Sequence, residues 1–485
     1  MAITKVTEGV RTLGTGEVLT ANMDTDPTNA SNLSSGDVPL AQLGNVDTSG
    51  ITANQDDIAL LGFKVAANGS LARYNLVDQS IDAFEDTSGV DASASTNETR
   101  DPSKYYSGAT SNVSEYLTGS GNWTTPAGVT TAHVLLVAGG GGGAGTYGGG
   151  GGAGGIVDHP TFAVSGDVAY VIGTGGAGGA QSTDGTIGVN STFGTLTALG
   201  GGKGGSQAPG GEGGSGGSSG YVATAPAGIQ TTDTGISADS RTYGHGYAAG
   251  IGGGSGEDYR SAGGGGAAAV GENAATGTQF SGAGGAGYAS TIADNSTTVY
   301  YGGGGGGAGS GAAPRSDGGA GGVGGGGDGG DDNSSPLYAG DPGTANTGGG
   351  GGGGEAASTG TGGAGGSGVL YIRWLTYGDM TLISNAQTAE SAPTTGDLVI
   401  TYTNGAGTAT VNTDIKAYIS RDGSAYTSAV TLVDQGDTGG HTILTANGVD
   451  LSGITSGTSM RWKIETLNQS ASKDTRIQAV SLGWS

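Results

Sequence analysis

Few side chains in this 485-residue chain are suited to catalysis or metal binding. Cysteine is absent, which excludes disulfides, thiol nucleophiles and cysteine metal sites. The four histidines, His133, His159, His245 and His441, stand far apart, and no H-E-x-x-H or Cys/His cluster occurs. A catalytic zinc site is therefore not expected. His133 begins a strand-like stretch and His441 follows "DTGG", which indicates structural roles for both.

The carboxylates are numerous but show no catalytic spacing. Asp328, Asp331 and Asp332 in "GGGGDGGDDN" could offer oxygen ligands to calcium, but they match no defined calcium loop, and a solvated acidic turn is the alternative. A glycan hydrolase needs two positioned carboxylates, and none of the 42 acids is singled out as a partner of another. The stretch "GGGKGGS" has Gly204 where a phosphate-binding loop requires Ser or Thr. We therefore expect no enzyme activity, no catalytic residue, no cofactor and no metal site.

Aromatic side chains between the glycine runs are the best candidates for recognition. Tyrosine offers flat apolar area and a polar tip at low entropic cost, as binding loops require. The alternative is that these side chains cap the ends of a glycine bundle or pack between subunits. The candidates for receptor binding are Tyr221, Tyr243, His245, Tyr247, Tyr259, Tyr288, Tyr300, Tyr301 and Tyr338.

Composition limits the partners of the chain. Lys and Arg total 17 against 42 Asp and Glu, a net charge of −25. The electrostatic field of so negative a chain repels phosphate backbones and anionic lipid, so we expect no nucleic-acid partner. No window approaches the roughly 20 apolar residues of a membrane span, and "MAITKVTEGVRTLGTGEVL" holds no apolar run of signal-peptide length. The expectation is a chain folded in a cytoplasm and not inserted into a membrane.

Glycine, with 111 residues, sets the architecture. A flexible linker is one interpretation, but the runs recur between strand-like pieces such as "HVLLV". Collagen requires a strict Gly-X-Y repeat with abundant proline, and the chain has neither. We expect a bundle of polyglycine helices of the polyproline-II type, bonded laterally because no side chain keeps them apart. Occasional Ala and Ser in the runs should face outward or lie at the edge of the bundle.

Four segments follow from these patterns. Residues 1–57 are polar and turn-rich, as in an extended attachment arm. Residues 58–117 contain a hairpin signal at "NG", residues 118–374 hold nearly all the glycine, and residues 375–485 alternate strands and turns as in a β-sandwich or jelly roll. The expected class is all-β with almost no α-helix. We further expect 58–117 and 375–485 to pack together, with the glycine-rich domain projecting from them.

The set "NWTTPAGVTTAHVLLVAGGGGGAG", "GGAGGIVDHPTFAVSGDVAYVIGTGGAGG", "NSTFGTLTALGGGKGG" and "GGAGGSGVLYIRW" resembles the glycine-rich domain of bacteriophage tail-fibre and receptor-binding proteins, over about 119–374. Two flanking pieces, "ALLGFKVAANGSLARYNLVDQSIDAF" and "TRIQAVSLGWS", are similar to parts of structural proteins of marine tailed phages. The resemblance to tail-fibre tip adhesins of T-even-type phages is architectural only.

The resemblance implies a virion adhesin assembled in the host cytoplasm. It would be a homotrimer that joins other tail or capsid proteins through its N-terminal arm and attaches without catalysis to a bacterial glycan or outer-membrane protein. A capsid decoration protein or head fibre without a receptor is the alternative. A polyglycine protein of a cell surface and an enzyme are less favoured classes.

Overall fold

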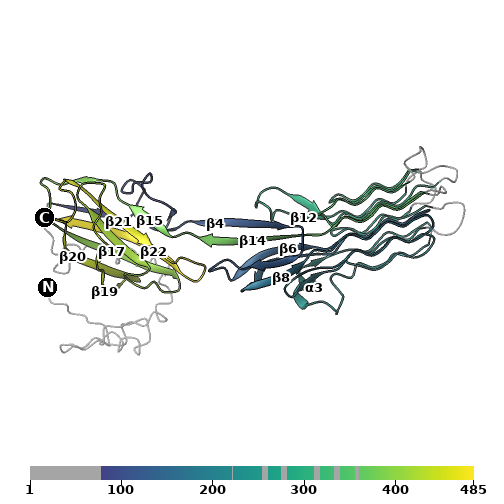
Figure 1. Ribbon diagram of the computed structural model, residues 1–485, viewed down its shortest axis with the longest axis horizontal. Coiled ribbons are helices and arrows are strands. Elements are labelled where there is room, and N and C mark those ends of the chain that lie inside the picture. Colours follow the sequence, from purple (N-terminus) through teal and green to yellow (C-terminus); the bar gives the residue numbers. More distant parts are fainter. Residues whose placement is uncertain are drawn as a thin grey trace, which may run out of the picture.

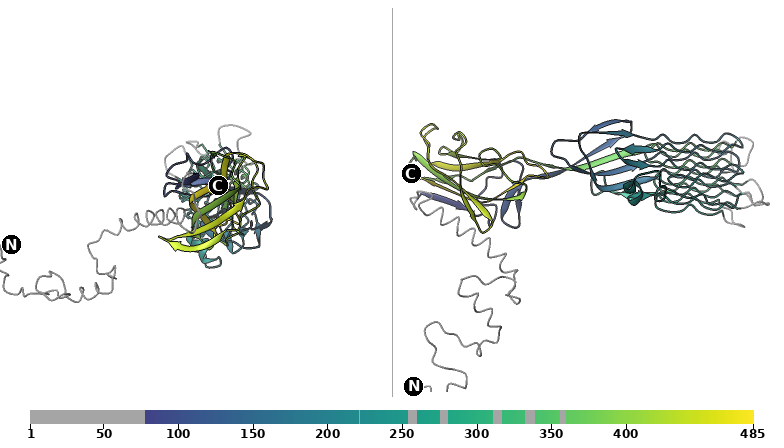
Figure 2. Two further views of the ribbon diagram at one scale, coloured as in Figure 1. Left: turned by 90° about the vertical axis from the view of Figure 1, so that its left-hand side faces the viewer. Right: turned by 90° about the horizontal axis from the view of Figure 1, so that it is seen from below.

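The molecule is elongated and almost entirely β (Figure 1; Figure 2). The computed structural model describes residues 78–220, 222–253, 260–274, 281–310, 317–331, 339–355 and 360–485. The expected arm at 1–57 and the hairpin signal in 58–77 lie outside them. A β-sandwich holds the C-terminus, and a narrow ribbon of β4 (Thr110–Leu117) and β14 (Val369–Tyr377) runs from it to the glycine-rich bundle. The one helix of the described residues is α3 (Ala238–Thr242), and the expected all-β class is confirmed.

Two antiparallel sheets form the sandwich. The larger has the order β19 (Val433–Thr438), β20 (His441–Asp450), β17 (Thr395–Ala406), β22 (Asp474–Trp484), β3 (Tyr105–Gly108) and β2 (Glu98–Asp101), with β1 (Gln79–Asp82) beside β22. In the smaller, β15 (Met380–Ile383), β16 (Gln387–Thr388) and β18 (Ile415–Ser420) all pair with β21 (Ser459–Thr466). In β21, "SMRWKIET", every second side chain is buried, the period of a strand with one face on a core.

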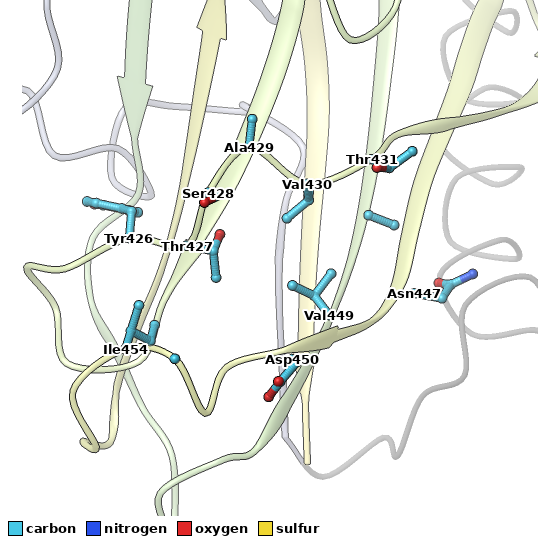
Figure 3. A pocket seen from close by; sticks show the side chains of 12 residues that line it. Tyr426, Thr427, Ser428, Ala429, Val430, Thr431, Asn447, Val449, Asp450 and Ile454 are labelled. Carbon is cyan, nitrogen blue, oxygen red and sulfur yellow. The ribbon is translucent and has the colours of Figure 1, made fainter.

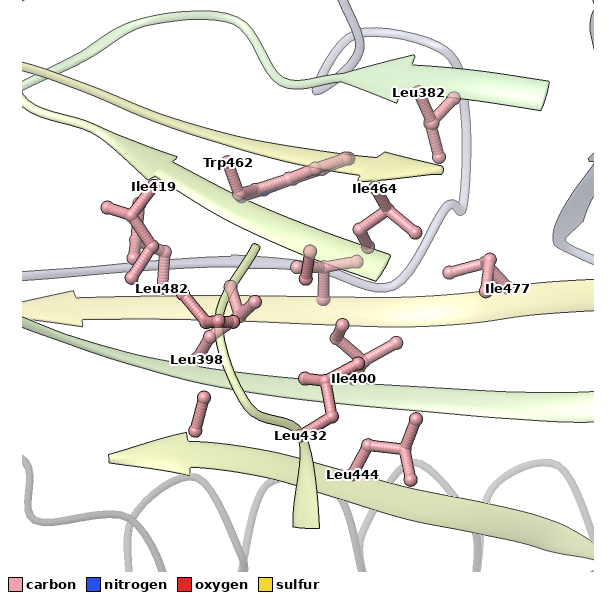
Figure 4. Packing of buried hydrophobic residues seen from close by; sticks show 14 of the residues in the cluster. Leu382, Leu398, Ile400, Ile419, Leu432, Leu444, Trp462, Ile464, Ile477 and Leu482 are labelled. Atoms are coloured by element: carbon pink, nitrogen blue, oxygen red, sulfur yellow. The ribbon is translucent and has the colours of Figure 1, made fainter. Parts of the chain in front are cut away.

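The core between these sheets is continuous (Figure 4). Trp462 of β21 lies opposite Leu398 of β17 and Leu482 of β22, and all three are at most 1% exposed. Phe84, from the segment before the glycine-rich domain, is fully buried and packs edge-on against Trp462 with ring centroids 6.2 Å apart. Side chains from both sides of the glycine-rich domain therefore share one core.

A second pair of sheets forms the base of the glycine-rich domain. A five-stranded sheet has the order β11 (Gly244–His245), β7 (Ile156–Ala163), β6 (Thr131–Val137), β14 and β4. Against it packs a four-stranded sheet of β10 (Leu196–Ala198), β9 (Ser191–Phe193), β8 (Asp167–Val171) and β5 (Gly121–Thr124). The opposite face is covered by a hairpin of β12 (Tyr288–Ser290) and β13 (Val299–Tyr301). Since β4 belongs to this base, the domain begins before residue 118.

Beyond the base, the chain runs back and forth as extended rods without strand pairing (Figure 1). Run 138–145 shows how the rods are joined. The N–H groups of Gly141 and Ala144 donate to the carbonyls of Gly152 (2.8 Å) and Gly149 (3.1 Å), so the partner repeats every third residue. N–H groups of this run donate to runs 148–155, 183–189 and 361–367, and its carbonyls accept from runs 173–180, 199–205 and 348–354. A period of three is that of a polyproline-II-type helix, so each inner rod is hydrogen-bonded on every side.

The rods pack too closely for a side chain at most inner positions. A Cβ on Gly140 would lie 2.1 Å from the carbonyl oxygen of Gly349, and one on Gly151 would lie 2.1 Å from that of Gly141. Both distances are far inside van der Waals contact. Glycine is therefore required by the approach of neighbouring backbones, and the lateral hydrogen bonds offset its entropic cost.

The expectation that Ala and Ser of the runs face outward is wrong for the inner rods. Ala144, Ala153, Ser215 and Ser218 are fully buried, because small side chains fill spaces between rods and the hydroxyls find carbonyl acceptors. Ser218 Oγ, for example, donates to the Ala262 carbonyl at 2.5 Å. At the edge of the bundle the expectation holds: in run 173–180 the exposed side chains are those of Thr174, Ala177 and Ala180, at every third position.

Candidate functional site

The end of the bundle away from the sandwich is formed by the turns and run ends of the rods (Figure 1). Thr146 and Tyr147 join the two central rods there, both with positive φ (33° and 55°). Ser261 Oγ donates to the Tyr147 carbonyl at 3.0 Å, and the Gly253 N–H donates to the Arg260 carbonyl at 3.2 Å. Ser261 therefore begins its run beside the central turn, and the run that ends at Gly253 lies next to Arg260. We call this surface the distal end.

Three of the recognition candidates are absent from the described residues. Tyr221, Tyr259 and Tyr338 fall in the gaps of the described ranges. Gly220 and Val222 flank the first, and Gly253 and Arg260 bound the gap that holds the second. The gaps of the described ranges include "GSGEDY" (254–259), "ATGTQF" (275–280) and "DNSSPLY" (332–338). These sequences are far richer in large and polar side chains than the rods.

Three other candidates are packed into the base. Tyr243 lies against His159 with ring centroids 4.0 Å apart, and Tyr301 is 3% exposed in the cluster under the hairpin. Tyr288 donates its hydroxyl to Asp158 Oδ2 at 2.8 Å. Burial raises the pKa values of Tyr288 and Tyr301 above the ordinary tyrosine value. These three side chains stabilise the fold, so their removal would report on stability before binding.

The remaining candidates lie at the base but are more accessible. Tyr247 is 45% and Tyr300 44% exposed. His245 of β11 is half-buried and stacks on the ring of Tyr288, with centroids 4.1 Å apart and planes at 27°. The structure thus brings His245 and Tyr288 together, while Tyr247 and Tyr300 each present an open ring at the end of the bundle nearer the sandwich.

A polar cluster that sequence reasoning missed surrounds this stacked pair. His133 of β6 bonds through Nε2 to Asp158 of β7, and Arg373 of β14 donates Nη2–H to His133 Nδ1 at 3.2 Å. Burial opposes ionisation of Asp158, but the bonds from His133 and Tyr288 outweigh it and hold the pKa of Asp158 below its ordinary value. Strand register brings these residues together (His133 is opposite Arg373, and Asp158 is opposite Leu135), and no local motif signals it.

This cluster is not a nucleophile-activating dyad. Arginine has only donors, so His133 Nδ1 must accept from Arg373, and its proton lies on Nε2 toward Asp158. Both ring nitrogens are therefore occupied. A catalytic histidine needs one nitrogen within reach of the hydroxyl or water that it activates, and here neither is available.

In the acidic turn that could have bound calcium, two aspartate carboxylates accept hydrogen bonds from backbone N–H groups. Asp328 Oδ1 accepts from the N–H of Gly321, and Asp331 Oδ1 from that of Gly318, both at 2.6 Å. Asp332 lies outside the described residues. Among the described residues no group of three or more His, Asp or Glu side chains is placed to hold a metal ion.

A groove of about 580 Å³ opens in the sandwich (Figure 3). One wall is the irregular segment 426–431, and the other is the end of β20 with Val449 and Asp450. Hydroxyl and amide groups of Thr427, Thr431 and Asn447 line its rim. The walls come from distant parts of the chain, so the sequence did not indicate the groove. Its titratable side chains are Asp450 and Tyr426, and burial raises the pKa of Tyr426 so that it stays a neutral phenol.

No helix in the described part of the chain is long and apolar enough to cross a lipid bilayer. No curated protein sequence matches the chain. Residues 113–375 match the family described as "Glycine-rich domain". This match covers more than half of the 485 residues and runs from β4 through the rods to β14, and the chain therefore belongs to this glycine-rich domain family.

Proposed function

We propose that the chain is a fibre protein of a phage virion, which attaches to a bacterial surface through the distal end of its glycine-rich bundle. The observation that carries this proposal is the lateral bonding of the rods. Successive amides of run 138–145 each find a carbonyl on a different neighbour, so the bundle is a rigid support and not a linker. A rod of eight residues spans about 25 Å.

The geometry favours presentation of loops. Rods return to the same end many times, so chain segments far apart in sequence meet there. Binding surfaces gain affinity when loops are held by a rigid scaffold, because less entropy is lost on binding. The connecting segments carry large and polar side chains, whereas the inner rods admit only small residues, so a substitution in a connecting segment would not disturb the packing of the rods.

The chemistry of the described residues favours binding over catalysis. His133 is fully engaged by Asp158 and Arg373, and the described acids near the distal end bond to backbone amides. The net charge of −25 opposes nucleic acid and anionic lipid as ligands. The resemblance of the segment order to tail-fibre and receptor-binding proteins points to a receptor on a bacterial cell, either a glycan or an outer-membrane protein.

The decisive experiment exchanges three segments that follow glycine runs in the sequence and leaves the base intact. Residues 254–259, 275–280 and 332–338 are replaced by Gly/Ser sequence of equal length, and binding of labelled protein to intact bacteria is measured by flow cytometry over a panel of strains. A double variant at the base, Tyr247→Ala with Tyr300→Ala, serves as the control, since both side chains are exposed. The proposal predicts that the segment exchange abolishes binding and the base variant keeps it.

Two results would overturn the proposal. Retained binding by the segment exchange, with loss in the base variant, would move the receptor site to the base tyrosines. Labelling of the capsid instead of the tail by antibody in electron micrographs of virions, with no cell binding, would identify a decoration protein. Circular dichroism and solution scattering must show that both variants keep the wild-type fold.

A further inference from the structure

The β12–β13 hairpin connects two rods of the bundle and packs on the five-stranded sheet of the base. It joins the rod that ends at Gly287 to the rod that begins at Gly302, and it lies across the face of β6, β7 and β14. Beneath it, Ile292 is 1% exposed and Tyr301 3% exposed. They pack with Leu135, Val137, Ile156 and Val369.

Beside this apolar contact, six polar side chains link the hairpin to the sheet through hydrogen bonds and ring stacking. His245 stacks on Tyr288 at 4.1 Å, and Tyr288 donates to Asp158 at 2.8 Å. At the other end of the chain of contacts, Arg373 bonds to His133 and also donates Nη1–H to Asn295 Oδ1 at 2.9 Å. We call these side chains the latch: His133, Asp158, His245, Tyr288, Asn295 and Arg373. Two of its bonds, from Tyr288 and to Asn295, fasten the hairpin itself.

The latch is partly enclosed. The side chains of His133 and Asp158 are 22% and 12% exposed, and Ser114 Oγ adds a further bond to the Ala293 carbonyl at 2.9 Å. Bonds between groups so little exposed are stronger than those in water, and the cost of leaving one partner unsatisfied is larger. A change of protonation in this cluster therefore acts directly on the docking of the hairpin.

We propose that the latch is an acid-sensitive fastening, which holds the β12–β13 hairpin on the sheet at neutral pH and loosens it when its histidines gain protons. This device goes beyond the proposed attachment function and does not depend on it. Through the latch, the pH of the surroundings would change how firmly the hairpin docks at the junction between the bundle and its base.

The geometry of His133 gives the first reason. Its Nδ1 accepts from Arg373 only while the ring is neutral. A second proton would turn this acceptor into a donor that faces a guanidinium, which is always charged. The bond would break, and Arg373 would lose the orientation in which it holds Asn295.

The position of His245 gives the second reason. Burial lowers the pKa of His245 below its ordinary value, and the charge of Asp158 offsets this only in part. A lowered pKa means that the docked state binds protons less readily than the undocked state, so docking is favoured above the ordinary histidine pKa and weakens as pH falls below it. Asp158 titrates only at still lower pH.

The charged and titratable groups that bond to or stack on the two histidines belong to the latch, and His159 of β7, outside it, also interacts electrostatically with His133. Asp158 comes from β7, Arg373 from β14 and Tyr288 from β12, while the turn between β12 and β13 offers the neutral Asn295. Tyr288 stays protonated through the whole range, because burial raises its pKa. Within the latch, His245 is thus the group whose lowered pKa links docking to mildly acidic pH.

The test is hydrogen exchange of the full-length protein, read by mass spectrometry in peptides covering 288–301 and corrected for intrinsic exchange. Between about pH 7.5 and about pH 5, wild-type protection of this hairpin should fall on the order of tenfold relative to β21, the internal reference. The double variant His133→Gln with His245→Phe keeps a donor, an acceptor and a stacked ring but cannot titrate there. Its protection should not change with pH.

Two single variants keep the test falsifiable if that double variant folds poorly. Tyr288→Phe removes the bond to Asp158 but neither histidine, so the hairpin should be less protected at both pH values with the wild-type ratio between them. His159→Gln removes another buried histidine, whose pKa is also lowered by burial but which does not contact the hairpin, and should leave the response intact. Equal wild-type protection at both pH values would overturn the proposal, as would an unchanged response in the double variant.

Discussion

Gly141 and Gly152 lie on adjacent antiparallel rods, joined by a hydrogen bond of 2.8 Å from the N–H of Gly141 to the carbonyl of Gly152. A Cβ on the neighbouring Gly151 would lie 2.1 Å from the Gly141 carbonyl oxygen, and one on Gly141 would lie 2.1 Å from that of Gly202, so rods this close require glycine. This relationship recurs through the bundle, so the stability of the domain depends on backbone bonds that a single methyl group can interrupt.

The first prediction concerns Gly151→Ala. The added Cβ would meet the Gly141 carbonyl oxygen at 2.1 Å, so the rods must separate and weaken several lateral bonds. We expect a loss of about 1–3 kcal/mol, as for other overpacked interiors, measured by denaturant unfolding. Ala177→Ser, on the exposed side of an edge rod, is the matched control and should change little. Equal stability of Gly151→Ala and the wild type would contradict close packing of the rods.

Ser218→Ala tests the buried hydroxyls of the lattice. Ser218 Oγ bonds to the Ala262 carbonyl at 2.5 Å and to the Gly150 carbonyl at 3.2 Å, and the residue is fully buried. Removal should cost about 1–2 kcal/mol, because the buried Ala262 carbonyl loses the hydroxyl donor, while the Gly150 carbonyl keeps the Ser218 N–H as a donor. Ser428→Ala, at an exposed position in the sandwich, should be neutral in the same thermal unfolding experiment. If both variants behave alike, the hydroxyl does not serve as a bridge between rods.

Tyr301 and Tyr300 are neighbours in β13 with opposite roles. Tyr301→Ala should reduce the free energy of unfolding by about 3 kcal/mol, since it empties a site in the core under the hairpin. Tyr300→Ala should change it by less than about 0.5 kcal/mol because its side chain is 44% exposed. A reversed order of the two values would show that the strand faces the sheet with the other set of side chains.

Acid sensitivity of the sandwich should depend on Asp414. Burial opposes its ionisation, but the ion pair with Lys473 at 2.7 Å and bonds from Thr410 and Asn468 prevail and lower its pKa from 3.8 to about 2. A lowered carboxyl pKa contributes stability above pH 3.8 and loses it as pH falls toward 2, here up to about 2 kcal/mol.

The variant Asp414→Asn provides the comparison. It should be less stable at neutral pH and should lose less stability than the wild type between pH 4 and pH 2, as followed by chemical unfolding at each pH; the loss that remains comes from other carboxyls with lowered pKa values, such as Asp91. Parallel pH profiles for the variant and the wild type would exclude Asp414 as the source of the acid sensitivity.

Much of the fold follows from local patterns in the sequence. Alternation in "SMRWKIET" predicts a strand buried on one face, and β21 is such a strand. Glycine runs that recur between strand-like pieces favour laterally bonded rods over a flexible linker, and the hydrogen bonds between runs confirm the rods. The edge rods also carry a signal, since "GTGGAGGA" places a side chain at every third position and the central "GGGGG" runs do not.

Other features depend on long-range register, which a single sequence does not reveal. His133 and Asp158 meet because β6 and β7 pair around a bulge between Ala132 and Val134. Tyr288 reaches them from a hairpin 130 residues farther along the chain than Asp158. For the same reason, the sequence does not distinguish Tyr301 from Tyr300 as recognition candidates, whereas β13 turns Tyr301 toward the sheet and leaves Tyr300 exposed.

The measurement that tests the central claim most directly is hydrogen exchange of the glycine amides, resolved by NMR or mass spectrometry. If the runs form a bonded lattice, amides of 138–145 and 148–155 will exchange orders of magnitude more slowly than those of an unstructured chain, as slowly as the strands of the sandwich. Exchange of these runs at the rate of a random coil would contradict the lattice, and with it the proposal that the bundle supports a binding surface.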